Sequence, residues 1–254
     1  MISKNKIKFL RSLKLKKHRD NYQKTLLEGI RLIDESLNFN ADIQNIWTTE
    51  EIINSNKGLI NKIKSKKINF DIINDNDFKL ISDTKHSQGI LAEVSIKKYF
   101  DHELQSDIDG NIVILDNISD PGNIGTILRT CAWYNIRTIV FTNNTSDPFN
   151  LKCIRSGMGS HFYFSNLIRM DSKNLINYLN NNKYKILCAD LDGKNLDTIN
   201  IKENWAIILG SEAHGISNNF KHIDKVTIKK AGKIESLNVS VAAGIILDKL
   251  INQQ

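Results

Sequence analysis

From residue 111 onward, short apolar segments of strand character alternate with segments of helical period, and this alternation leaves few possible folds. The strand-like segments are residues 112–116, 138–141, 162–164, 185–189, 205–209 and 226–228. Helices are predicted at residues 124–134, 150–156 and 173–179, and a last helix begins near Ser236 or Asn238. Apolar strands separated by helices form a parallel sheet with helices on both faces. The sequence therefore predicts an α/β domain built on a parallel sheet.

The first hundred residues show a shorter pattern of the same kind. A basic amphipathic helix is predicted at residues 4–17. Strands are predicted at residues 25–29, 43–47, 68–72 and 89–96, and helices at 30–37, 49–64 and 74–81. This order predicts a small α/β/α sandwich. Residues 97–110 are polar and without period, which is typical of a linker. We expect two domains, residues 1–100 and residues 106–254.

Composition excludes several classes of protein. The chain has 254 residues, of which 41% are hydrophobic and 25% charged, as in soluble globular proteins. No apolar run approaches the roughly 20 residues that span a bilayer, and the N-terminus lacks the apolar core of a signal peptide. We therefore expect a cytoplasmic protein without a membrane partner. The three cysteines are too far apart for a zinc site, so no metal is predicted, and Cys131 and Cys188 are expected to be buried thiols.

The positive charge is concentrated at the N-terminus. Residues 1–31 hold ten Lys and Arg against two acidic residues, a net charge of +8, whereas the whole chain carries +7. A basic segment of this kind is typical of proteins that bind a phosphate backbone. The candidate RNA contacts are Lys14, Lys16, Lys17 and Arg19. A solvated helix face is the alternative interpretation.

Three loops that follow predicted strands contain the residues suited to chemistry. In an open parallel sheet, ligands bind beyond the carboxyl ends of the strands. The loops are NISDPGNIGTILR (117–129), LGSEAHG (209–215), which holds Glu212 and His214, and the polar segment before SLNVSVAA (236–243). The glycine signature of a dinucleotide-binding fold is missing, which disfavours a dehydrogenase. Each loop alone is a weak signal, but their joint occurrence at strand ends indicates one site.

These three segments, in this order, resemble the three motifs of the SpoU-type RNA ribose 2′-O-methyltransferases, and the resemblance covers residues 111–251. The segments at 8–19, 26–37 and 87–94 are similar, more loosely, to the substrate-binding domain of that family. The resemblance implies a C-terminal segment threaded into a deep trefoil knot, a topology that general folding rules treat as rare. It also implies a homodimer with sites near the subunit interface.

The resemblance further implies S-adenosylmethionine as cofactor. Carried over by motif position, the residues expected to contact it are Leu209, Gly210, Ile228, Leu237 and Asn238. Backbone groups at loop turns can bind the edges of adenine, while Leu237 and Ile228 provide apolar contact.

The same resemblance assigns catalytic roles to Arg129, Asn123, Glu212, Ser236 and Asn238. A guanidinium stays protonated far above neutral pH and is a poor base, so Arg129 is expected to stabilise the developing alkoxide or to act as a base only in a strongly shifted environment. Asn123 is expected to position Arg129 or the ribose, and Glu212 to orient Arg129 or the neighbouring loop. Ser236 and Asn238 are expected to bind ribose or phosphate.

The sequence departs from the family pattern at two places and leaves the substrate open. Lys229 and Lys230 follow Ile228 where the family has Pro-Met, and Ser87 stands where it has Pro. Ribosomal RNA, most specifically 23S, is the expected substrate because a separate N-terminal domain is typical of the members that act on it. A transfer-RNA ribose methyltransferase and a non-catalytic RNA-binding protein are the alternatives.

Overall fold

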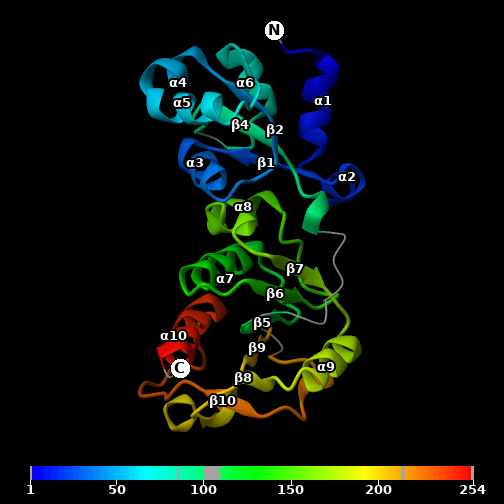
Figure 1. The fold of residues 1–254 in the computed structure, drawn as a ribbon, viewed down its shortest axis with the longest axis vertical. Helices are drawn as coiled ribbons and strands as arrows, with labels where there is room; N and C mark the ends of the chain where they lie inside the picture. The colour runs from blue at the N-terminus through cyan, green and yellow to red at the C-terminus, as the bar shows by residue number, and fades with distance from the viewer. Residues whose placement is uncertain (1, 85, 100–107, 109, 213–214, 253–254) are drawn as a thin grey trace. The chain divides into compact units, whose positions relative to one another are not determined.

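The computed structural model describes residues 2–84, 86–99, 108, 110–212 and 215–252, and its elements are drawn in Figure 1. The chain divides into two compact units, Met1–Asp101 with Phe149–Phe162, and His102–Pro148 with Tyr163–Gln254. The segment Phe149–Phe162 thus groups with the first unit, which the sequence division did not include. Most of the predicted linker, residues 100–107 and 109, lies outside the described residues, so the domain limits stay a prediction.

The first unit is built on a four-stranded sheet in the order β1-β4-β2-β3. Strand β4 is antiparallel to β1 and β2, and β2 is parallel to β3. The strands are β1 (Lys24–Glu28), β2 (Ile43–Thr48), β3 (Phe70–Ile72) and β4 (Ile90–Ser95). The helices are α1 (Lys4–Ser12), α2 (Lys16–Tyr22), α3 (Ile30–Asn38), α4 (Glu50–Ser55), α5 (Lys57–Ser65), α6 (Asp75–Ile81) and α8 (Leu151–Gly157), with short 3₁₀ turns at Lys97–Tyr99 and Ser160–Phe162.

Two helices predicted in this unit as single elements are interrupted. The predicted helix 49–64 breaks at Asn56, whose backbone lies outside the helical region at φ −122° and ψ 50°. The predicted helix 4–17 is α1 followed by α2, because Leu15 adopts an extended backbone between them. Leu10 and Leu13 are buried as the period predicts, whereas the Leu15 side chain is 61% exposed.

The second unit contains a six-stranded sheet in the order β10-β8-β9-β5-β6-β7, and all five strand pairs are parallel. The predicted parallel sheet is therefore confirmed. The strands are β5 (Ile112–Leu115), β6 (Thr138–Phe141), β7 (Asn166–Arg169), β8 (Lys185–Asn195), β9 (Trp205–Leu209) and β10 (Lys225–Thr227).

Helices cover both faces of this sheet, as Figure 1 shows. Helix α9 (Ser172–Asn181) buries Leu175 and Leu179 against Ile112 and Ile114 of β5. Helices α7 (Pro121–Trp133) and α10 (Val239–Asn252) pack together on the opposite face. Successive strand residues face opposite sides, so a strand covered on both faces needs apolar residues throughout, and β5, β6 and β9 are buried along their whole length.

The strand predicted at residues 162–164 was wrong. The strand at this point in the order is β7, which begins at Asn166. Phe162 ends a 3₁₀ turn and packs its ring against Tyr99, with 6.4 Å between the ring centroids. An aromatic residue that is buried in a turn produces the same apolar sequence pattern as a buried strand, which is why a strand was predicted here.

Two further features of the described residues bear on the sequence predictions. None of their helices is both long and apolar enough to cross a membrane. The thiols of Cys131 and Cys188 are free and buried as predicted. Burial raises the pKa of Cys131, and burial with the nearby Asp190 carboxylate raises the pKa of Cys188 to about 12, so neither is a reactive thiolate at neutral pH.

Candidate active site at the carboxyl ends of β5 and β9

The first motif forms a sharp turn between β5 and α7. Asn117 adopts the left-handed backbone region at φ 56° and donates its backbone N–H to Thr142 Oγ1 at 3.1 Å. Asp120 then caps α7 by accepting the Gly122 N–H at 3.1 Å, and Pro121 occupies the first helical position, where its missing N–H costs nothing. This turn places Asn123 in the first turn of α7.

The second motif is a closed loop after β9. Ser211 and Gly215 exchange backbone hydrogen bonds of 3.0 and 2.8 Å. A Cβ atom on Gly210 would lie 2.6 Å from the Gly215 carbonyl oxygen, so only glycine fits there without displacement of the backbone. Glu212 follows Ser211 inside this loop, whereas His214 lies outside the described residues.

The third motif starts α10. Asn238 Oδ1 accepts the backbone N–H groups of Ser240 at 2.9 Å and Val241 at 3.4 Å, and the Ser240 hydroxyl at 2.5 Å. Of the two predicted caps, Asn238 is therefore the one that starts the helix, which begins at Val239.

Side chains from all three motifs meet at Glu212. Its Oε1 accepts hydrogen bonds from Asn123 Nδ2 at 3.1 Å, Asn238 Nδ2 at 2.7 Å and the Val239 N–H at 3.1 Å. Asn238 Nδ2 also reaches Asn123 Oδ1 at 3.1 Å. Hydrogen bonds to a carboxylate are the strong ones. We name Asn123, Glu212 and Asn238 the motif cluster, because they hold the three loops in one arrangement.

Arg129 and Ser236 do not join the motif cluster. Both side chains are exposed, and neither makes a hydrogen bond or ion pair with any residue that the structure describes. The structure thus brings together three of the five predicted catalytic residues and leaves two at the surface. The Arg129 guanidinium has all five N–H donors available to a ligand.

The five predicted cofactor contacts lie in the chain between the end of β9 and the start of α10, and they differ in exposure. Leu209 is buried, Gly210 and Ile228 are half-buried, and Leu237 and Asn238 are exposed. The loop between Ile228 and Asn238, residues 229–237, is exposed throughout. Its peptide groups make no hydrogen bond to described residues. Free backbone donors and acceptors beside the apolar Ile228 and Leu237 fit the edge and face of an adenine ring.

The predicted RNA contacts differ in how they present their charge. Lys16 and Lys17 are exposed, with Lys16 paired to Asp20 four residues on. Lys14 forms an ion pair with the Asp83 carboxylate at 3.2 Å, and its Nζ donates a hydrogen bond to the Ser82 carbonyl at 2.8 Å.

The assignment of Arg19 to this surface is corrected by the structure. Only 2% of the residue is exposed, and its guanidinium donates to the carbonyl oxygens of Leu13 at 2.9 Å and Lys14 at 2.8 Å. These bonds close the turn between α1 and α2, so the arginine stabilises the fold instead of facing a ligand.

Asp116 is a residue of this region that the motifs did not identify. It is 1% exposed, directly follows β5, and accepts the Ser217 backbone N–H at 2.8 Å. This bond joins the first loop to the chain after the second. The sequence signal was an acidic residue placed immediately after four apolar strand residues.

The chain is similar to known protein families over most of its length. Residues 110–248 match the model of the SpoU rRNA Methylase family, and residues 4–92 match the MRM3-like substrate binding domain. The chain is 27% identical over 245 residues, 95% of its length and 94% of the relative's, to the 23S rRNA (guanosine(2553)-2'-O)-methyltransferase RlmP of Bacillus subtilis. It is 31% identical over 241 residues to an uncharacterized tRNA/rRNA methyltransferase of Mycoplasma genitalium, covering 89% and 96% of the two chains.

Solved structures share the fold over the whole chain. A protein of the TrmH family from Porphyromonas gingivalis superposes with a TM-score of 0.85 at 29% identity, covering 100% of both chains. An AdoMet-bound rRNA methyltransferase from Sinorhizobium meliloti shares the fold with a TM-score of 0.83 at 23% identity, covering 98% and 95% of the two chains. The family match spans the three loops and the motif cluster, and the chain therefore belongs to the SpoU rRNA methylase family of RNA methyltransferases.

Proposed function

We propose that this protein transfers a methyl group from S-adenosylmethionine to a ribose 2′-hydroxyl of 23S ribosomal RNA. The observation that carries the proposal is the motif cluster, in which Glu212 joins Asn123 and Asn238 from loops far apart in the chain. It stands beside an exposed loop with free peptide groups and an exposed arginine. A relative that spans nearly the whole chain is named as a 23S ribose methyltransferase, which supports this substrate.

Arg129 and the motif cluster have different roles in the proposed methyl transfer. S-adenosylmethionine would supply a methyl group on a positively charged sulfur, and the sulfur would leave as S-adenosylhomocysteine with the electron pair of the broken carbon–sulfur bond. The ribose hydroxyl would lose its proton to water as its oxygen bonds to the methyl carbon. Arg129 lies at the surface of α7 and stabilises the negative charge that develops on the 2′-oxygen. Arg129 donates hydrogen bonds to this oxygen or to the adjacent phosphate and does not take the proton, because a guanidinium carries donors and no acceptor.

The motif cluster positions the three loops of the site relative to one another. Glu212 holds the side-chain amides of Asn123 and Asn238 and the first free N–H of α10 at one point. The cluster therefore fixes the loop that contacts the cofactor relative to the helix that carries Arg129. Small errors in such alignment are costly, because a displacement of about 1 Å can slow a reaction roughly 10²-fold.

A homodimer, a deep knot and a cytoplasmic location stay predictions. The exposed apolar side chains of α7 and α10 support dimer formation, since Trp133 is 84%, Val241 50% and Ile245 37% exposed. The two helices pack together, with Tyr134 Oη donating to Asp248 Oδ1 at 2.9 Å. Exposed apolar surface of this kind is typical of an interface between protein chains. Arg129 lies one helical turn before Trp133, so a second subunit docked here would complete the surroundings of the site.

Gly210→Ala is expected to weaken S-adenosylmethionine binding about tenfold to hundredfold. The added Cβ would lie 2.6 Å from the Gly215 backbone, and overpacking of this kind costs about 1–3 kcal/mol. Gly58→Ala is the matched control, because Gly58 lies in α5, outside the proposed cofactor site, and a Cβ there would meet nothing within 4 Å. Isothermal calorimetry on the full chain measures both. Equal affinities for the two variants would contradict the proposed cofactor site, and no binding by the unaltered protein would overturn the proposed donor.

A further inference from the structure

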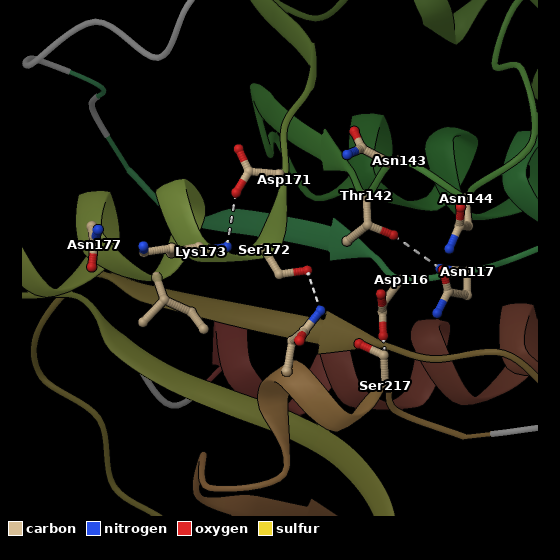
Figure 2. Close-up of a pocket in the computed structure, with 12 residues that line it drawn as sticks. Asp116, Asn117, Thr142, Asn143, Asn144, Asp171, Ser172, Lys173, Asn177 and Ser217 are labelled. Carbon is tan, nitrogen blue, oxygen red and sulfur yellow. Dashed lines mark hydrogen bonds between the residues drawn. The ribbon is translucent and has the colours of Figure 1, made fainter.

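A polar cavity of about 670 Å³ lies at the carboxyl edge of the parallel sheet and contains none of the catalytic or cofactor residues assigned above. Its lining comes from the chain immediately after β5 and β6, the N-terminal half of α9 and the segment after the second motif, as Figure 2 shows. Its volume is in the range of pockets that hold small organic molecules, about 300–1,000 Å³.

Side-chain amides dominate the lining. Asn117, Asn143, Asn144 and Asn177 all line the cavity, and their side chains make no hydrogen bond with residues that the structure describes. The Asn117 backbone N–H is held by Thr142, which leaves its side-chain amide available. Each carboxamide places two donors next to an acceptor. A ligand that fits must present donors and acceptors side by side.

Two buried groups lie among these amides. Asp116 is 1% exposed and uses one carboxylate oxygen, Oδ2, to accept the Ser217 N–H at 2.8 Å. The Ser217 hydroxyl is buried and has no hydrogen-bond partner among the described residues. Buried polar atoms are nearly always satisfied, so this hydroxyl needs a partner, which a ligand or a water in the adjoining cavity would supply.

The charge and polarity of the lining exclude other ligand classes. Asp116 and Asp171 oppose the single cation Lys173, so the cavity does not suit a phosphate or another anion. Ile176 is the only apolar side chain among the lining residues, which excludes a lipid or other apolar ligand. A flat ring with a polar edge satisfies both limits, with Ile176 against its face and the amides along its edge.

We propose that this cavity binds an unpaired nucleobase of the substrate RNA, and this inference rests on the proposed function. Asn pairs with the adjacent donor and acceptor of adenine, and a carboxylate accepts from the amino group of cytosine. Proteins recognise single-stranded RNA by such base-edge contacts. A free nucleotide would need cations for its phosphate, and the one lining cation, Lys173, is opposed by two carboxylates, whereas RNA leaves its phosphates outside.

The cavity is coupled to the active site through Asp116. Its hydrogen bond to Ser217 fixes the chain five residues after Glu212, and Asn117 begins the turn that places Asn123. A base in the cavity therefore contacts Asn117, which begins the loop that carries Asn123, and Ser217, which follows the loop that carries Glu212. This arrangement selects the RNA sequence beside the methylated nucleotide.

The test uses the full chain and three labelled single-stranded RNA homopolymers, of A, C or U and about 12 nucleotides long. Their affinities are measured by fluorescence anisotropy. The unaltered protein should bind one homopolymer about tenfold or more tightly than the others. The pair Asn144→Ala and Asn177→Ala should remove this preference. The matched control, Asn180→Ala with Asn181→Ala, changes exposed asparagines of α9 that do not line the cavity and should keep it.

Three outcomes would overturn the inference: equal binding of all homopolymers by the unaltered protein, a preference that survives the cavity substitutions, or its loss in the control. AMP, CMP and UMP are titrated as competitors, and a monophosphate that binds in the cavity as tightly as the homopolymer would assign it to free nucleotides. Failure of methyl transfer by a protein that keeps its base preference would overturn the proposed function alone. Loss of preference with methyl transfer intact would overturn only the cavity assignment.

Discussion

Arg129→Ala is expected to lower the rate of methyl transfer by about 10² to 10³, the effect of removing one donor that acts on charge in the transition state. The side chain is exposed and makes no bond with the described residues, so its removal should leave the fold unchanged. Affinity for S-adenosylmethionine should also be unchanged, because the proposed cofactor contacts lie in the other two loops. Single-turnover methylation beside calorimetry measures both quantities.

Two further variants make this result specific. Arg129→Lys should restore little activity, because one ammonium cannot reproduce the planar fork that contacts ribose and phosphate together. Lys221→Ala removes an exposed cation of the same unit that takes no part in the motifs, and it should methylate at the normal rate. If Arg129→Ala methylates normally, or if it loses cofactor binding, the role given to Arg129 is wrong.

Glu212→Ala is expected to reduce methyl transfer by about 10² or more by a different route. It removes the acceptor that holds Asn123, Asn238 and the Val239 N–H together, and each bond to a charged acceptor is worth about 1.5–3 kcal/mol. Unlike Arg129→Ala, it should also weaken cofactor binding, because Asn238 starts the helix that ends the cofactor loop. Rates and cofactor affinities are measured as for Arg129.

Glu212→Gln distinguishes a role of Glu212 in positioning the loops from a role of its negative charge. The glutamine keeps an oxygen that can accept the same bonds, so it should recover most of the rate if Glu212 positions the loops. Glu50→Ala is the matched control, an exposed carboxylate of α4 that lies outside the proposed site and makes no hydrogen bond to described residues. A glutamine variant as slow as the alanine variant would mean that the negative charge itself takes part in the reaction.

The sequence predicted the sheet of the second unit better than its connections. Continuous apolar segments such as β5 and β9 can be satisfied only by burial on both faces, so their parallel arrangement followed from composition. The error at residues 162–164 arose because Phe162 is buried by ring packing in a turn, and hydrophobicity alone does not distinguish a turn from a strand. The grouping of Phe149–Phe162 with the first unit depends on contacts distant in sequence, such as Thr25 Oγ1 to the Phe149 carbonyl at 3.1 Å.

The candidate site was predictable as a set of motifs but not as a geometry. Loop composition and order identified Asn123, Glu212 and Asn238, whereas their meeting at one carboxylate oxygen depends on the folded positions of three loops. Arg19 is a residue that the sequence identified but assigned to the wrong environment. In the sequence, its positive charge was assigned to a basic surface. In the structure, its guanidinium donates hydrogen bonds to the carbonyl oxygens of Leu13 and Lys14, which follow the end of α1, and the side chain is buried.

Ribose 2′-O-methylation is mapped in RNA from cells of the source organism that carry the intact gene, a deletion or Arg129→Ala. We expect one 2′-O-methylated position of 23S ribosomal RNA to disappear in the deletion and in Arg129→Ala, and to return when the intact gene is restored. An unchanged map of 23S ribosomal RNA, or the loss of a position in transfer RNA in its place, would contradict this expectation.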